Sequence, residues 1–193
     1  MLSEIRPAIV STILFTLLLG VAYPLAITGV SKVAFPWQAE GSLIRDATGK
    51  VIGSALIGQA FAKPEYLHPR PSAAGNGYDA SNSSGSNYGP LSADLAKRIK
   101  GDADALRAST GHKEIPDDAI TTSGSGLDPD VSPAYALLQT DRIAKARGVS
   151  ADAVKGVVSA HIEGPFLGFI GQPHVNVLKT NLDLDAKSPK RSA

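Results

Sequence analysis

An uncharged apolar run near the N-terminus most constrains what this chain can fold into. From Pro7 to Ser31 the sequence contains no Lys, Arg, Asp or Glu. A helix needs roughly 20 apolar residues to cross a hydrocarbon core, so this run is long enough to span a bilayer with some tilt. Pro7 suits the first turn of such a helix, because its missing N–H would be unpaired there anyway. We therefore predict a short N-terminal tail over residues 1–7 and one transmembrane helix over residues 8–31.

Five residues in and after this span indicate membrane contacts. Gly20, Ala22 and Pro24 interrupt its second half, and such residues in spanning helices often mark kinks or close approaches to neighbouring helices. We predict that these three residues contact other transmembrane helices. Phe35 and Trp37 follow the span, and aromatic rings sit well at headgroup depth. We predict that they form an interfacial anchor in the lipid bilayer.

Two other interpretations of the apolar run stay open. A cleaved signal peptide has a basic start and an apolar core, although that core usually covers only about 7–15 residues. A buried soluble helix would show a recurring polar face, and none recurs here. Orientation is also open. Lys32, Arg45 and Lys50 follow the span and only Arg6 precedes it, which favours a cytoplasmic C-terminus, yet long domains translocate largely regardless of charge.

Beyond the membrane, the patterns predict a mixed domain over residues 32–185. Turn-forming residues 46–49 separate two β-rich runs and predict a hairpin. Apolar spacing predicts a helix over about 91–109. Ser132 followed by Pro133 predicts the start of a helix that ends at Gly148, where glycine favours a helix stop.

The C-terminal part completes the predicted fold. Ser150 is a good N-cap for a third helix with Val154, Val157, Val158 and His161 along one face. The alternation in VNVLKTNLDLD predicts a strand that closes a single sheet. We expect an α+β soluble domain anchored by one N-terminal transmembrane helix, with a flexible basic tail over residues 186–193.

The segment 63–90 is rich in Gly, Pro, Ser and Asn and has hardly any aliphatic residues. This composition is typical of a flexible linker. Interspersed aromatic and charged residues give it groups with which to pack, and a long ordered loop is usually functional or contacts a partner. Both interpretations stay open. The residues that we predict to face a partner are Tyr66, Arg70, Tyr78, Asp79, Tyr88 and Asp128.

Composition and motifs exclude several kinds of function. The net charge is +1, from 19 basic and 18 acidic residues, so we expect no nucleic-acid partner. The chain has no cysteine, which excludes disulfides, thiolate metal sites and a cysteine nucleophile. No two of the four histidines have the i, i+4 spacing of a zinc site, and no GxSxG elbow is present. We predict no catalytic residue and no metal site.

Two Ser/Gly clusters invite comparison with phosphate-binding loops. They cover residues 81–87 and 121–128. Glycine-rich loops with free N–H groups can hold phosphate, but neither cluster contains a GxxxxGK[ST] run or a suitably placed lysine. Turns and caps are the simpler interpretation of both clusters.

Several longer stretches resemble one protein family when taken in order. They are RPAIVSTILFTLLLGVAYPL, FPWQAEGSLI, GSALIGQAF, HPRPSA, SGSN, ITTSGSGLDPDVSP, RIAKARGV and IGQPHVNVL. Over nearly its whole length, the sequence resembles the C subunit of the Kdp potassium-transporting P-type ATPase, the KdpC family. Each stretch alone is weak, but their order and the chain length agree with the family.

This resemblance implies an accessory, non-catalytic subunit of a high-affinity ATP-driven potassium importer in the bacterial inner membrane. The implied partners are a channel-like potassium-translocating subunit, a P-type ATPase catalytic subunit and a small one-span subunit. The resemblance implies an extracytoplasmic soluble domain and no cofactor of its own, with ATP bound through the complex. It also implies a role in raising the ATP affinity of the catalytic subunit.

A loose likeness to the signature motif of ABC transporters underlies the family's proposed nucleotide contact. In this sequence the matching candidates are Ser123, Gly124, Ser125 and Gly126, with Gln139 in the following helix. The alternative function is therefore a membrane-anchored cytoplasmic nucleotide-binding module. A third alternative is a secreted α+β protein released by signal cleavage.

Overall fold

The computed structural model describes residues 2–188 and divides the chain into two compact units, residues 1–54 and 55–193. The first unit contains a long apolar helix and a hairpin. The second contains a mixed α+β fold. The predicted domain boundaries after residues 7, 31 and 185 stay predictions, and residues 189–193 of the predicted tail lie outside the described part.

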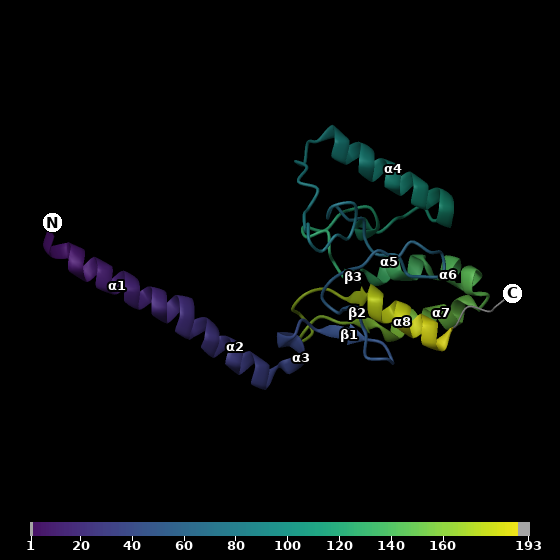
Figure 1. Ribbon diagram of the computed structural model, residues 1–193. Helices are drawn as coiled ribbons and strands as arrows, with labels where there is room; N and C mark the ends of the chain where they lie inside the picture. The colour runs from purple at the N-terminus through teal and green to yellow at the C-terminus, as the bar shows by residue number, and fades with distance from the viewer. Residues whose placement is uncertain (1, 189–193) are drawn as a thin grey trace. The chain divides into compact units, whose positions relative to one another are not determined.

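The apolar run forms a continuous helical rod (Figure 1). It consists of η1 (Leu2–Glu4), α1 (Ile5–Leu17), the π-helical turn η2 (Leu18–Ala22) and α2 (Tyr23–Ala34). The 30 residues from Ile5 to Ala34 have a mean hydropathy of 2.1, and none of their most apolar stretch is buried within the chain. By length and composition this helix is able to cross a membrane.

The π-helical turn has a local cause. Pro24 has no N–H, so it cannot donate to the carbonyl of Gly20 four residues earlier. The preceding N–H, of Tyr23, donates instead to the carbonyl of Leu18, five residues back. Extra turns of this kind are common where a helix accommodates a proline or a functional site. Gly20, Ala22 and Pro24 thus lie in or beside the turn, and their contact with other helices stays a prediction.

A hairpin follows the rod within the first unit. After α3 (Pro36–Ala39), strands β1 (Leu43–Arg45) and β2 (Val51–Ser54) pair antiparallel, as predicted. The Asp46 carboxylate closes the turn by accepting hydrogen bonds from the N–H groups of Thr48 and Lys50. The Trp37 indole donates to the Leu43 carbonyl at 3.1 Å, while the rings of Trp37 and Phe35 stay largely exposed. Their role as a lipid anchor stays a prediction.

The second unit places helices around a small antiparallel sheet (Figure 1). Strand β5 (His174–Asn176) pairs with β3 (Asp130–Val131) on one side and with β4 (Ile162–Glu163) on the other. The helices are α4 (Ala93–Thr110), η3 (Asp117–Ala119), α5 (Pro133–Leu138), α6 (Thr140–Arg147), α7 (Ala151–Ala160) and α8 (Val177–Lys187). Their apolar faces enclose a core whose fully buried members are Leu67, Ala136, Ile143, Val154, Val158, Val175 and Leu184.

Local capping explains most helix boundaries in this unit. The side chains of Ser92, Ser132 and Ser150 each accept a hydrogen bond from the backbone N–H three residues later. Gly111 and Gly148 end α4 and α6 in the left-handed conformation that glycine tolerates. The three predicted helix starts are confirmed, as is the predicted stop at Gly148.

Three details of the predicted fold are wrong. The strands form two separate sheets, not one. The predicted helix from Ser132 to Gly148 is interrupted at Gln139, which separates α5 from α6. The predicted final strand is only β5, because the Asn176 side chain accepts from the Lys179 N–H and starts α8. Val177, Leu178, Asn181 and Leu184 are buried at helical spacing, so the apparent alternation belongs to one helix face.

Candidate functional site

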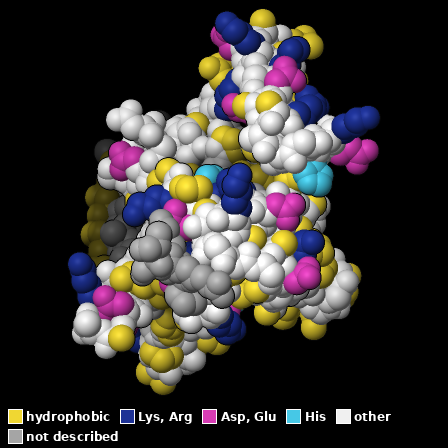
Figure 2. All heavy atoms as spheres, turned by 90° about the vertical axis from the view of Figure 1, so that its right-hand side faces the viewer, with side chains coloured by type: hydrophobic (Ala, Val, Ile, Leu, Met, Phe, Trp, Pro, Cys, Tyr) yellow, Lys and Arg dark blue, Asp and Glu magenta, His cyan; other side chains and the backbone are white. Residues whose placement is uncertain are grey.

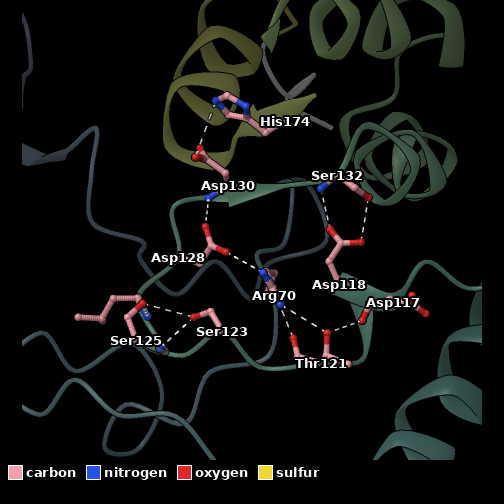
Figure 3. Close-up of polar contacts among 12 residues, drawn as sticks. Arg70, Asp117, Asp118, Thr121, Ser123, Ser125, Asp128, Asp130, Ser132 and His174 are labelled. Carbon is pink, nitrogen blue, oxygen red and sulfur yellow. Dashed lines mark hydrogen bonds and ion pairs between the residues drawn. The ribbon is translucent and has the colours of Figure 1, made fainter. Parts of the chain in front are cut away.

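Arg70 contacts residues 121–128, a segment of the second unit more than 50 positions later in the chain (Figure 3). Its Nη1 atom lies 2.8 Å from Oδ2 of Asp128, in an ion pair whose side chains are about three-quarters buried. Its Nε and Nη2 atoms approach the backbone carbonyl and the hydroxyl of Thr121, each at 3.4 Å. The Arg70 carbonyl accepts a hydrogen bond from the Tyr78 hydroxyl at 2.7 Å. We call Arg70, Tyr78, Thr121 and Asp128 the Arg70 junction.

Two carboxylates, that of Asp128 within the Arg70 junction and that of Asp118 near it, fix the starts of β3 and α5. Asp128 accepts from the Asp130 N–H at 3.0 Å through Oδ1, while its Oδ2 holds Arg70. Asp118 accepts from both the N–H and the hydroxyl of Ser132, the residue that caps α5. These carboxylates therefore position backbone segments (Figure 3).

The two Ser/Gly clusters, which are 40 residues apart in sequence, pack against each other. The Ser125 carbonyl accepts hydrogen bonds from the Ser84 N–H at 3.0 Å and from the Ser83 hydroxyl at 2.9 Å. The Gly126 carbonyl accepts from the Ser72 hydroxyl at 2.6 Å. The predicted partner-facing loop and the predicted nucleotide loop thus form one folded surface.

Gly126 is required where these segments meet. Its φ angle is +66°, in the left-handed region. A Cβ atom on it would lie 2.6 Å from both the Ala74 nitrogen and the Ser84 carbonyl oxygen. Gly124, two residues earlier, has open space at the same point. Only the second of these two glycines is demanded by the packing.

Two N–H groups of the Ser/Gly cluster at residues 121–128 are engaged by serine hydroxyls of the same cluster. The Ser123 hydroxyl accepts from the Gly126 N–H at 2.9 Å, and the Ser125 hydroxyl accepts from the Leu127 N–H at 3.1 Å. These are donors that a phosphate cradle would need to present. Direct nucleotide contact through the Gly126 N–H would therefore require that group to give up its bond to the Ser123 hydroxyl.

In the described part of the chain, Gln139 makes no hydrogen bond to the Ser/Gly cluster at residues 121–128; its side chain bonds to the backbone of His68. Its Oε1 accepts from the His68 N–H at 2.8 Å and from Arg142 Nη2 at 2.6 Å, and its Nε2 donates to the His68 carbonyl at 3.1 Å. Gln139 borders a cavity of about 370 Å³ between α4 and α6 that none of residues 123–126 lines. The structure does not gather the five nucleotide candidates around one cavity.

His68 gives this region a predicted pH response. Burial, together with the nearby positive charge of Arg142, lowers the pKa of His68 below its ordinary value of 6.5. As the pH falls, the His68 side chain of the unfolded chain therefore becomes protonated near pH 6.5, and that of the folded chain only at a lower pH. We expect the free energy of unfolding to fall as the pH drops through this region and to be unaffected well above it.

Urea titrations of the full chain in detergent between pH 5 and 8 test this expectation. The variant His68→Gln should lose the part of the acid-side decline that this histidine causes. His112→Gln is the matched control, because His112 is exposed and lies outside the Gln139 contact. Parallel pH profiles for His68→Gln and the parent chain would contradict the assignment.

A second cavity, of about 380 Å³, opens beside the Arg70 junction. The acidic and basic residues that line it are Arg70, Asp117, Asp118, Asp128, Asp130 and His174. Burial raises the pKa of Asp130. Within residues 2–188, no group of three or more His, Cys, Asp or Glu side chains is arranged to hold a metal ion. The Asp118 and Asp128 carboxylates make the backbone and Arg70 contacts described above, and Asp130 Oδ1 accepts from the Asn176 side-chain amide at 2.9 Å.

Comparison with known proteins identifies the family of the chain. Residues 5–186 match the KdpC family, described as the K⁺-transporting ATPase c chain. The chain belongs to the KdpC family.

Curated relatives agree over nearly their full length. The chain is 66% identical over 189 residues to the potassium-transporting ATPase KdpC subunit of Caulobacter sp. strain K31, covering 98% of this chain and 96% of that protein. It is 58% identical over 191 residues to the KdpC subunit of Beijerinckia indica, with the same coverage. It is 50% identical over 202 residues to that of Rhodopseudomonas palustris strain CGA009, covering 98% and 100%.

The residues predicted to face a partner lie in different settings in this structure. Arg70, Tyr78 and Asp128 turn inward and form the Arg70 junction. Asp79 and Tyr88 are exposed, and the Asp79 carboxylate accepts from the N–H and hydroxyl of Ser81. Contact of any of these residues with a partner stays a prediction.

Tyr66 leads to a site that the sequence analysis missed. Its hydroxyl donates to Asp185 at 3.2 Å, and its ring lies 5.2 Å from the guanidinium carbon of Arg147. Arg147 is 1% exposed and donates to the carbonyls of Glu65, Leu184 and Ser188 and to the carboxylate of Asp185. In the sequence, Arg147 is one of the basic residues that precede the predicted helix stop at Gly148.

The surface charge of this KdpC-family chain is mixed. On the face shown in Figure 2, Lys and Arg side chains are interspersed with Asp and Glu side chains and do not gather into one basic area. Extended basic areas are the usual electrostatic signature of nucleic-acid binding. The absence of a nucleic-acid partner stays a prediction.

Proposed function

We propose that this chain is an accessory, non-catalytic subunit of a high-affinity, ATP-driven potassium import complex. The observation that carries the proposal is the KdpC-family match, which covers the apolar helix and the α+β unit together over residues 5–186. In the proposal the helix spans the bacterial inner membrane once. It packs there against a channel-like potassium-translocating subunit, a P-type ATPase catalytic subunit and a small one-span subunit.

The geometry of the α+β unit supports an accessory role. Its polar side chains hold segments of the fold together. Asp128 accepts from Arg70, Asp118 accepts from the Ser132 hydroxyl, and the Ser123 hydroxyl accepts from the Gly126 N–H. A rigid folded surface of this kind suits protein contact, because its side chains lose little further freedom on binding. We therefore propose that the surface formed by residues 66–88 and 123–133 faces a partner subunit.

A higher ATP affinity of the catalytic subunit is part of the proposal. If the α+β unit lies outside the cytoplasm, as we propose, it acts on ATP binding as a coupling free energy between distant sites, transmitted through the membrane part. Direct contact through residues 123–126 and Gln139 would require a cytoplasmic unit. Contact through the Gly126 N–H would also break its hydrogen bond to the Ser123 hydroxyl.

Deletion of the gene tests the proposal. In a strain with no other potassium uptake system, loss of this chain should abolish growth at very low potassium, because the remaining subunits lack a part of the importer. Growth should return when the gene is supplied on a plasmid and should be normal at high potassium. Deletion cells that grow like the parent at very low potassium would contradict the proposal.

Cysteine labelling tests the orientation. The chain has no cysteine, so Ala105→Cys on the exposed face of α4 introduces a single reactive thiol without removing a polar contact. In intact cells with a permeabilised outer membrane, we expect a membrane-impermeant maleimide to label this variant as fully as in detergent-opened cells. Labelling only after the inner membrane is opened would place the unit in the cytoplasm and favour the nucleotide-binding alternative.

A further inference from the structure

The turn from Pro165 to Ile170, between β4 and β5, presents four large apolar side chains to solvent. Phe166, Leu167 and Phe169 are 70%, 69% and 76% exposed, and Ile170 is 50% exposed. Single exposed apolar residues are ordinary on protein surfaces. Four of them within one tight turn form an apolar tip, which is typical of an interaction site.

Backbone hydrogen bonds within this turn fix the tip and engage four of its N–H groups. The Phe166 and Ile170 N–H groups donate to each other's carbonyls at 2.8 and 2.9 Å. The Gly168 N–H donates to the Pro165 carbonyl, and the Phe169 N–H to the Phe166 carbonyl. Leu167 is held at a φ of +54°, a left-handed conformation that a bulky residue rarely adopts. The tip is therefore a shaped hairpin end.

Charge is absent from the tip and begins only at its base. No residue from Gly164 to Pro173 carries a charge. Glu163 and His174 flank the segment, with their side chains 3.8 Å apart, and Lys179 lies 3.3 Å from Glu163. An apolar end on a charged base is the arrangement of protein segments that enter the boundary between lipid headgroups and acyl chains.

A lipid surface fits these observations better than a polar protein surface. Lipid acyl chains offer no hydrogen bonds, so only a segment with internally paired backbone groups enters them readily. The N–H groups of Phe166, Gly168, Phe169 and Ile170 meet this condition. The chain also carries its own candidate span, Ile5–Ala34, which would keep the unit at a high effective concentration near a bilayer.

We infer that the Pro165–Ile170 turn is a second membrane contact, which inserts its apolar side chains at the headgroup boundary of the bilayer that holds the span. This inference rests on the span being in a membrane and is independent of potassium transport. The growth assay above and the lipid assay below can therefore fail separately.

Tryptophan fluorescence at the tip tests the inference. Trp37 is the only tryptophan, so full-length Trp37→Phe/Phe169→Trp carries a single probe at the tip, and Trp37→Phe/Phe166→Trp places a second one. The matched control is Trp37→Phe/Leu91→Trp, because Leu91 is 98% exposed in the same unit but outside the turn. Each variant is reconstituted in phosphatidylcholine vesicles, with and without brominated acyl chains.

The inference predicts a blue-shifted emission for the probes at positions 169 and 166, quenching by bromines placed near the headgroup, and protection from aqueous iodide. The probe at position 91 should emit at longer wavelength, respond to iodide and ignore the bromines. Equal behaviour of the tip and control probes would overturn the inference. A blue shift without bromine quenching would also overturn it, because a second copy or another protein would then cover the tip.

Discussion

Replacing Arg147 with Met is expected to lower the free energy of unfolding of the α+β unit by about 3–5 kcal/mol. The methionine side chain fills much of the same volume but donates no hydrogen bond. The substitution therefore removes the guanidinium donor from the carbonyls of Glu65, Leu184 and Ser188, although the Leu184 carbonyl keeps the Ser188 N–H. A buried carbonyl left without any donor costs roughly 1–3 kcal/mol. Urea unfolding of the full chain in detergent, followed by circular dichroism, measures the change.

Lys100→Ala is the matched control for the loss of a positive charge. Lys100 pairs with Asp104 across one turn of α4, and its side chain is 80% exposed. Exposed pairs of this kind contribute about 0.5 kcal/mol or less, so this variant should unfold close to the parent chain. If Arg147→Met were no more destabilising than Lys100→Ala, the buried guanidinium would not hold the unit together.

Replacing Gly126 with Ala is expected to destabilise the same unit by about 2–4 kcal/mol. Alanine would have to adopt a φ of +66°, and its Cβ would lie 2.6 Å from two backbone atoms of the neighbouring segments. Those atoms belong to residues 74 and 84, so the clash separates the two Ser/Gly clusters. Urea unfolding of the full chain again measures the loss.

Gly124→Ala makes the comparison specific to packing and also tests the nucleotide candidates. Its Cβ would meet no atom within 4 Å, so we expect stability within about 0.5 kcal/mol of the parent chain.

In the assembled complex, long-range coupling predicts an unchanged KM for ATP in this stable Gly124→Ala variant. A raised KM would instead favour direct contact between this loop and the nucleotide. Equal stability of the Gly126→Ala and Gly124→Ala variants would contradict the packing argument.

Local signals made much of the secondary structure predictable. Ser132 followed by Pro133, and Gly148 after a basic turn, are start and stop signals that act within a few residues, and the structure has both boundaries there. The end of the chain was misread because Val175, Val177 and Leu178 satisfy a strand pattern and a helix pattern over so short a stretch. The Asn176 cap decides in favour of a helix after that residue.

The candidate site depended on contacts that no local pattern contains. Arg70 and Asp128 are each predicted from the sequence to face a partner, and the structure joins them in an ion pair across 58 positions of the chain. Arg147 reaches Glu65 across 82 positions and Leu184 across 37. Burial of a charged residue follows from such long-range partners, so a single sequence offers little sign of it.

The π-helical turn at Leu18–Ala22 rotates the side chains of the second half of the apolar helix, about the helix axis, relative to those of the first half. Each residue of an α-helix rotates the chain by about 100°, and a π-helical turn contains one residue more than an α-helical turn. A side-chain stripe that runs straight along Ile5–Leu17 therefore continues along Tyr23–Ala34 on a face rotated by about that angle. One straight neighbouring helix cannot follow both stripes. In the proposed single-span arrangement, the two halves of the helix would therefore pack against different neighbours.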